Sequence, residues 1–226
     1  MFAYAASFSF AYVSLPTATG ALLLFGAVQV TMIVYGLWAG ERLVPLQLVG
    51  LLLALGGLLL LFLPGLSLAP PLGSSLLMIG AGVCWGIYSL RGKRVGDPLN
   101  TTAGNFARAA AFTVLLSVLL IPGLSLDMAG VGYAVVSGAL MSGLGYVVWY
   151  TAMPALNATS AAIVQLSVPV LAAAGGIVFL GEPMTFRLAL ASSAILGGIA
   201  LVIVRTQAAR NPGGGSQDAG DAHLRS

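Results

Sequence analysis

Residues 40–62 read GERLVPLQLVGLLLALGGLLLLF, a short polar turn followed by a long apolar run. From Pro45 to Phe62 the run contains no charged side chain. About 20 apolar residues in a helix cross the hydrocarbon core of a bilayer, so this run is nearly long enough to span a membrane. The stretch therefore predicts a turn followed by a membrane helix.

The composition of the whole chain agrees with this stretch. Hydrophobic residues make up 59% of the 226 residues and charged residues only 7%, and the mean hydropathy is +1.02. Soluble domains carry about 25% charged residues. The lipid bilayer is therefore the expected surrounding medium and the first expected partner of the chain.

Seven segments are long enough, or nearly so, to cross a bilayer. Because lipid offers no hydrogen-bond partners to the backbone, every span is expected to be helical. The predicted fold class is therefore all-α, a polytopic membrane helix bundle. The expected spans are residues 17–39, 45–63, 74–90, 105–121, 130–152, 158–180 and 187–204.

Few residues are suited to catalysis or to metal binding. Cys84 is the only cysteine and His223 the only histidine, which leaves no disulfide framework and no histidine-based triad or metal site. There is also no glycine-rich phosphate loop ending in Lys-Ser/Thr. We expect no cofactor, no metal and no enzymatic activity.

The basic residues are informative about orientation. With the loop containing Arg91, Lys93 and Arg94 in the cytoplasm, alternation of the spans places every Lys and Arg except Arg187 on that side. Basic residues gather in cytoplasmic loops of membrane proteins, so they indicate orientation here and not binding to nucleic acid. The C-terminus is then cytoplasmic, in what we expect to be a bacterial inner membrane, and the polar residues 206–226 are expected to be disordered.

The chain contains an internal repeat with an offset of 141 residues. Gly40-Glu41 aligns with Gly181-Glu182, and Leu55-Gly56-Gly57 aligns with Leu196-Gly197-Gly198. Residues 73–205 then form a complete repeat of five spans. Residues 1–63 hold two spans and the stub of a third.

The repeat predicts an inverted five-plus-five architecture, because a repeat of five spans reverses its direction in the membrane. Under this architecture we expect the first two helices and most of the third to be missing from this chain. We expect the chain to be a truncated or mis-started form of a ten-helix protein.

These segments resemble a known family. Over nearly all of residues 1–205 the sequence is similar to the EamA-like branch of the drug/metabolite transporter superfamily, on the stretches WAGERLVPLQLVGLLLALGGLLLL, GVCWGIYSL, GYVVWYTAMPALNATSAAIVQLSVPVLAAAGGIVFLGEPMT and ILGGIALVI. The resemblance implies a ten-helix secondary transporter, often an exporter of amino acids or other small metabolites, with a cavity between its halves. Ala191 stands where the family usually has glycine.

One candidate substrate site is centred on a proline inside a span. Pro169 frees the carbonyl of Gln165 and bends the helix, and Ser167 lies between them. Two polar side chains and an unpaired carbonyl suit an uncharged or zwitterionic ligand. The alternative is that neighbouring helices satisfy these groups.

Aromatic and hydroxyl side chains supply the other candidates. Residues with helical spacing share one face of the span 130–152 and one face of the span 74–90, as the wall of a small-molecule site would require. The candidates on these faces are Ser142, Tyr146, Trp149, Trp85 and Tyr88. An aromatic belt at the inner surface is the competing interpretation for Tyr35, Trp38, Tyr88, Trp149 and Tyr150.

No charge is expected inside a span. Glu41 and Glu182 lie at helix ends, and Arg108 is placed near the start of the span 105–121. The GxxxG pairs Gly36–Gly40 and Gly82–Gly86 predict close helix packing, and the first pair leaves a homodimer open.

The expected function is alternating-access transport, as an exporter, of a small organic metabolite that is amino acid-like or drug-like. The alternative is a non-transporting membrane remnant, or a half-module that needs a partner.

Overall fold

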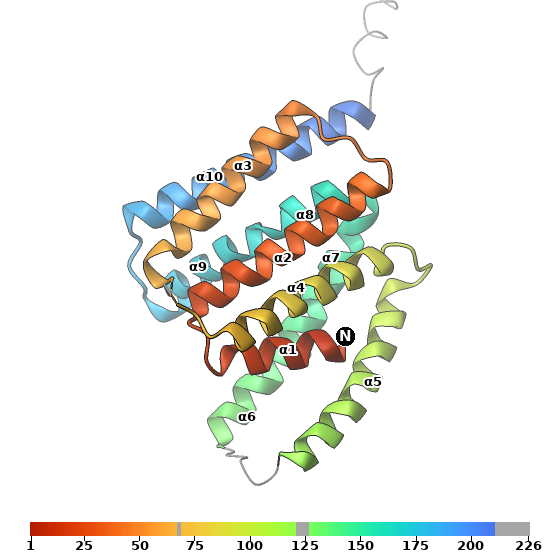
Figure 1. Cartoon of the computed structure of the whole chain (residues 1–226), viewed down its shortest axis with the longest axis vertical. Helices are drawn as coiled ribbons and strands as arrows, with labels where there is room; N and C mark the ends of the chain where they lie inside the picture. The colour runs from red at the N-terminus through yellow and green to blue at the C-terminus, as the bar shows by residue number, and fades with distance from the viewer. Residues whose placement is uncertain (67–68, 121–126, 211–226) are drawn as a thin grey trace, which may run out of the picture. The chain divides into compact units, whose positions relative to one another are not determined.

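The computed structural model describes residues 1–66, 69–120 and 127–210, and these residues form helices without a strand. Figure 1 shows their arrangement. The elements are α1 (Phe2–Tyr12), α2 (Thr17–Trp38), α3 (Pro45–Phe62), η1 (Leu63–Gly65), α4 (Leu72–Gly92), α5 (Pro98–Leu119), α6 (Met128–Val135), η3 (Val136–Met141), α7 (Ser142–Ala152), η4 (Met153–Ala155), α8 (Ala158–Gln165), α9 (Ser167–Leu180) and α10 (Phe186–Arg210).

Seven of the helical segments are long and apolar enough to cross a membrane, which confirms the predicted all-α polytopic bundle. One span, Met128–Ala155, combines α6, η3, α7 and η4. Its middle part, Val136–Met141, is π-helical. A π-helical turn changes the side-chain register along a helix and often occurs near functional sites.

The described residues form two compact units. Unit 1 contains Met1–Gly40 and Pro64–Ala161, and unit 2 contains Glu41–Leu63 together with the residues from Ala162 onward. These units cut across the two sequence repeats, because α3 of the first repeat packs against α10 of the second. Each unit is described by itself below.

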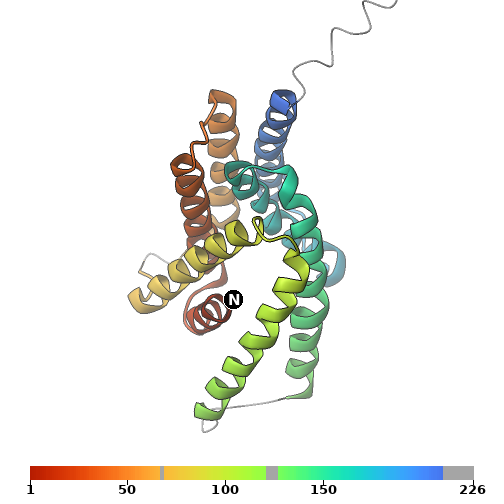
Figure 2. The same cartoon turned by 90° about the vertical axis from the view of Figure 1, so that its right-hand side faces the viewer.

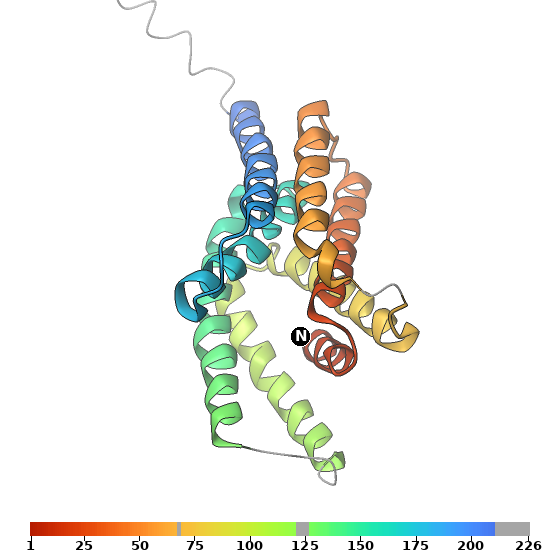
Figure 3. The same ribbon diagram turned by 90° about the vertical axis from the view of Figure 1, so that its left-hand side faces the viewer.

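Glycines set the contact between α3 and α10 in unit 2. A Cβ atom on Gly57 would lie 2.8 Å from the carbonyl oxygen of Ala191, and a Cβ atom on Gly198 would meet the carbonyl oxygen of Gly50. The order of these contacts makes the two helices antiparallel, and they lie side by side in Figures 1 and 3. Only residues without side chains let two helix backbones approach so closely.

The repeat offset of 141 residues relates these two contacts to each other. Adding 141 to Gly50 gives Ala191, and adding 141 to Gly57 gives Gly198, so the two contacts exchange partners. This exchange is the signature of a two-fold interface, here within one chain. Since the helices are antiparallel, the axis runs across them, as an inverted repeat requires.

The helix boundaries follow the same offset. α2 begins at Thr17 and α8 at Ala158, whereas α3 begins at Pro45 and α10 at Phe186. Among the described residues, the glycines with positive φ are Gly40 at 88° and Gly181 at 68°. Both occupy a left-handed turn position that favours glycine.

In unit 1, α4 packs against both α1 and α2. A Cβ atom on Gly82 would lie 2.6 Å from the carbonyl oxygen of Leu24, and one on Gly86 would lie 2.9 Å from Cγ2 of Thr31. The predicted packing role of this glycine pair is therefore confirmed. Figure 2 shows α5 beside the α6–α7 span, a further contact within unit 1.

Three expectations about helix ends were wrong. Gly40 lies in the turn beyond α2, so Gly36 and Gly40 are not a pair on one helix. The helix α5 begins at Pro98 and not at residue 105, because Asp97 caps it by accepting a hydrogen bond from the Asn100 amide at 3.0 Å. The helix α10 continues to Arg210.

The continuation of α10 takes in the first five residues of the predicted disordered tail. This stretch, Thr206–Arg210, contains no glycine or proline that would end a helix. The remaining tail, residues 211–226, lies outside the described residues.

We expect Gly57→Ala and Gly198→Ala to destabilise the protein to a similar extent, by about 1–3 kcal/mol, because each added methyl group meets the backbone of the opposite helix. The matched controls are Gly56→Ala, where a Cβ atom meets nothing within 4 Å, and Gly197→Ala, where it makes an ordinary contact at 3.8 Å. The measurement is the fraction of monodisperse protein in detergent after heating. Equal losses for all four variants would contradict the two-fold contact.

Candidate functional site

An aromatic cluster in unit 1 is the candidate site. Four helices contribute to it, and we name it the aromatic box. Its members are Tyr4 from α1, Trp85 and Tyr88 from α4, Phe106 from α5, and Tyr146 and Tyr150 from α7.

Tyr146 contacts most of the other rings of the box. Its ring centroid lies 5.3 Å from that of Phe106, 5.6 Å from Trp85, 6.2 Å from Tyr88 and 6.1 Å from Tyr150. The ring of Tyr4 lies 5.3 Å from that of Trp85. Such edge-on and stacked contacts form the kind of wall that binds apolar parts of small molecules.

Helical periodicity explains why these rings meet. Trp85 and Tyr88 are three residues apart on α4, and Tyr146 and Tyr150 are four apart on α7, so each pair lies on one face of its helix. Tyr146 is 8% exposed and Tyr150 is 5% exposed, which places both rings inside unit 1.

Polar groups line one side of the box. The Tyr88 hydroxyl donates to Oγ1 of Thr102 at 3.0 Å and accepts a hydrogen bond from the Asn105 amide at 3.4 Å. The guanidinium of Arg108 donates to Oδ1 of Asn105 at 3.4 Å. The Tyr146 hydroxyl donates to the sulfur of Met1 at 3.3 Å. Rings and hydrogen-bonding groups are therefore combined in one place.

Arg108 corrects an expectation from the sequence. Because α5 begins at Pro98, Arg108 lies halfway along a candidate span and not near its start. A charged side chain at the centre of a membrane helix costs at least about 2.5 kcal/mol, and such residues usually face a cavity or a protein interior. Arg108 is therefore a functional candidate that the sequence reading missed.

The structure brings together three of the predicted site residues, namely Trp85, Tyr88 and Tyr146. Ser142 lies on the same helix as Tyr146, but its hydroxyl donates to the Ser137 carbonyl at 2.9 Å, across the π-helical turn. Trp149 is half-buried, and its indole nitrogen has no hydrogen-bond partner within the part of the chain that the structure describes. Neither contributes a ring or a bond to the box.

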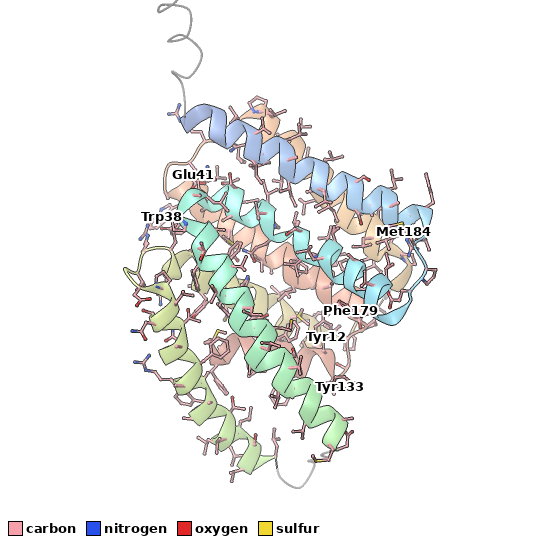
Figure 4. The ribbon with its side chains drawn as sticks, turned by 180° about the vertical axis from the view of Figure 1, so that it is seen from behind. Tyr12, Trp38, Glu41, Tyr133, Phe179 and Met184 are labelled. Atoms are coloured by element: carbon pink, nitrogen blue, oxygen red, sulfur yellow. The ribbon has the colours of Figure 1, made fainter. Side chains whose placement is uncertain are left out.

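Tyr150 was assigned to the belt by sequence, yet its ring stacks on Tyr146 inside the box. Tyr88 likewise belongs to the box. Trp38, by contrast, is 85% exposed at the end of α2, where an aromatic belt residue is expected (Figure 4). Spacing along one helix could not separate these cases, because burial depends on which helix packs against that face.

The three predicted residues around the proline belong to α8 and α9. The helix is interrupted at Leu166, just before Pro169, so the predicted irregularity is present. Gln165 is 5% exposed at the end of α8, and Ser167 begins α9. Their binding role stays a prediction.

The basic loop after α4 ties together one end of unit 1. Arg94 donates a hydrogen bond to the Tyr35 hydroxyl, and its guanidinium carbon lies 5.5 Å from the centre of that ring. Lys93 donates to the carbonyl of Leu156, beyond η4. Two cations of one loop thus connect α4 with α2 and with the segment after η4.

No group of three or more His, Cys, Asp or Glu side chains suited to a metal ion occurs in residues 1–66, 69–120 and 127–210. The chemistry that the box offers is therefore ring stacking, hydrogen bonding and one guanidinium charge.

Known proteins have sequences similar to this one. Residues 72–204 match the EamA-like transporter family. The chain is also 60% identical over 203 residues to an uncharacterized protein of Pseudomonas aeruginosa, with 90% of this chain and 70% of that protein covered. The chain belongs to the EamA-like transporter family. Three of the four helices of the box, α4, α5 and α7, lie within the family match.

More distant relatives carry transporter names. The threonine/homoserine exporter RhtA of Salmonella typhimurium is 31% identical over 159 residues, which cover 67% of this chain and 52% of RhtA. An uncharacterized transporter of Archaeoglobus fulgidus is 27% identical over 208 residues, with 88% of this chain and 71% of that protein covered. The chain therefore spans about half the length of RhtA.

The fold itself also has a solved counterpart. A crystal structure of a protein that is 24% identical matches with a TM-score of 0.77 and covers 90% of this chain and 74% of that chain. The family and the fold agree that this is an integral membrane protein with a polytopic helical bundle.

Tryptophan fluorescence tests the enclosure of the box. A variant with Trp38→Phe and Trp149→Phe keeps only Trp85, and one with Trp85→Phe and Trp149→Phe keeps only Trp38. We expect the Trp85-only protein to be quenched by acrylamide several-fold less than the Trp38-only protein, because rings surround Trp85 whereas Trp38 is 85% exposed. Equal quenching would contradict the box.

Proposed function

We propose that this protein is a secondary transporter that exports a small organic metabolite by alternating access across a bacterial inner membrane. Membership of the EamA-like transporter family supports this function. The inverted arrangement of α3 and α10 supports the mechanism, because inverted repeats allow one half to rock against the other around a fixed site.

The observation that carries the proposal is the aromatic box. Its six rings come from four different helices, so a relative movement of these helices would change the shape of the site. The rings suit an apolar or aliphatic body, and the polar groups on α5 suit a hydrogen-bonding head. RhtA is named for threonine and homoserine, and both molecules have this combination.

Alternating access also requires that one end of the protein opens and closes. We assign this role to the loop with Lys93 and Arg94, whose bonds join α4 to α2 and to the segment after η4. These bonds are few and lie at one end of unit 1, so breaking them would free that end. We place this loop on the cytoplasmic side, together with the C-terminus.

A half-module that needs a partner is the second candidate. The chain covers 70% of the Pseudomonas relative and 52% of RhtA. In this candidate, a partner supplies the remaining part of the transporter. The two candidates differ in one respect: a transporter is active when this chain is expressed alone.

Export by living cells tests the proposal. In a bacterial host without its own threonine exporters, expression of this chain should lower the internal threonine or homoserine concentration during growth on those amino acids. We expect Tyr146→Ala to reduce the efflux rate at least about tenfold, the effect of losing about 1.4 kcal/mol of binding. The exposed Trp38→Ala is the matched control and should keep the rate.

Efflux that is absent for a panel of amino acids and drugs, with the protein inserted normally, would favour the half-module. Equal loss of efflux in the Tyr146 and Trp38 variants would leave transport standing but contradict the site.

Labelling from outside the cell tests the orientation. Single cysteines at Val95 and Met184, in a Cys84→Ser background, lie in exposed positions of two different loops; Figure 4 shows Met184 after Phe179, at the turn into α10. A membrane-impermeant thiol reagent should label the Met184→Cys protein in intact cells and the Val95→Cys protein only after permeabilisation. The reverse pattern would place the C-terminus outside.

A further inference from the structure

Within unit 1 of the described chain, Arg108 is the one cation that lies inside a candidate span and away from the ends of that span. Arg108 and Arg91 are both exposed, but Arg91 lies near the end of α4, and Arg94 and Lys93 have partners in the loop. A charge halfway along a membrane span is unfavourable unless it is paired or serves a site. Arg108 therefore calls for a partner.

The chain itself supplies little to neutralise this charge. Across the described ranges 1–66, 69–120 and 127–210, the hydrogen-bond partner of Arg108 is the neutral amide oxygen of Asn105, and no carboxylate lies within ion-pair distance. The guanidinium bends back toward the start of α5, close to the position of Gly104. An amide at 3.4 Å leaves most of the five guanidinium donors unused.

A polar stripe links Arg108 to the aromatic box. Thr102, Asn105 and Arg108 are three residues apart along α5, and Phe106 of the box lies on the same helix. The hydrogen bonds run without a gap from Arg108 to Asn105, from Asn105 to the Tyr88 hydroxyl, and from that hydroxyl to Thr102. The stripe thus connects a positive charge to a ring of the box through one amide.

We infer that Arg108 binds the carboxylate of the molecule that the aromatic box accommodates. This inference rests on the proposed function and names the head group of the substrate. A planar guanidinium holds a carboxylate by two parallel hydrogen bonds, and the bond is strong where water is scarce. A single cation balances the single charge of a carboxylate, whereas a phosphate would bring about two.

Asn105 is then a positioning residue. Its amide oxygen accepts from Arg108 while its amide nitrogen donates to Tyr88, so it fixes the guanidinium relative to the rings. The length of the substrate follows from the same geometry, because two hydrogen bonds of 3.4 Å and the amide group separate the guanidinium from the Tyr88 hydroxyl. A carboxylate attached to an aliphatic or aromatic body meets this condition.

A pair of probes that differ only in the head group tests the inference. 4-Nitrobenzoate and 4-nitrobenzamide have the same ring, and both quench tryptophan, so their binding can be followed on the purified Trp85-only chain in detergent. We expect 4-nitrobenzoate to bind at least about tenfold more tightly, as hydrogen bonds to a charged group allow. Arg108→Gln should remove this preference and leave the affinity for the amide unchanged.

Two further variants separate the role of Arg108 from a structural one. Arg108→Lys keeps the charge but loses the paired donors, so it should retain part of the preference for the benzoate. Arg91→Gln removes an exposed cation at the end of α4 and should leave both affinities unchanged.

The outcomes distinguish this inference from the function on which it rests. If both probes bind and Arg108→Gln changes neither affinity, or lowers both equally, the carboxylate site is wrong while the box stands. If neither probe gives saturable quenching, the box does not bind small molecules and both proposals fail. Selective loss of benzoate binding in a protein that moves no substrate would support the site and contradict transport.

Discussion

The absence of water around the helices is the constraint on which the structure depends. In a soluble protein, burial of apolar side chains drives helices together, but lipid tails are as apolar as leucine and give no such drive. Close backbone packing must take its place. Gly57 and Gly198 provide it between α3 and α10, and Gly82 provides it between α4 and α2. Each lies where a Cβ atom would collide with a carbonyl oxygen of the opposite helix.

The same constraint explains the use of a duplicated unit. One helix surface that packs well can be used twice if the second copy meets the first across a two-fold axis. The offset of 141 residues does this for α3 and α10, and it also returns glycine to the left-handed turn at positions 40 and 181. The two repeats therefore share both the close-packing positions and the turn glycine. The antiparallel contact between α3 and α10 agrees with a two-fold axis that runs across the helices.

The sequence predicts the elements well and the site only in part. Apolar length identifies all seven spans, because lipid admits few alternatives to a helix. The offset identifies the helix starts at Thr17, Ala158, Pro45 and Phe186 in corresponding pairs. Sequence periodicity does not show which helix packs against each face of a span. Tyr150 therefore looked like a belt residue, although Tyr88 and Tyr146 enclose it.

The start of α5 shows how a local signal can change a functional reading. The stretch after Asp97 is polar, and polarity alone suggested a loop as far as residue 105. The Asp-Pro pair was the better signal, since an aspartate cap followed by proline is typical of a helix start. Moving the start by two turns carries Arg108 from the membrane surface to the middle of the helix.

The position of Arg108 also bears on whether packing or the proposed binding explains the polar groups on α5. Packing alone would be served by leucine at positions 102, 105 and 108, without the cost of a charge in lipid. Instead the Tyr88 hydroxyl joins the three side chains into one connected series of hydrogen bonds that runs from Arg108 to Thr102. Such a series orients groups with respect to each other, which packing does not need and ligand recognition does. The polar stripe therefore supports the proposed carboxylate site, since the stability of the bundle does not require it.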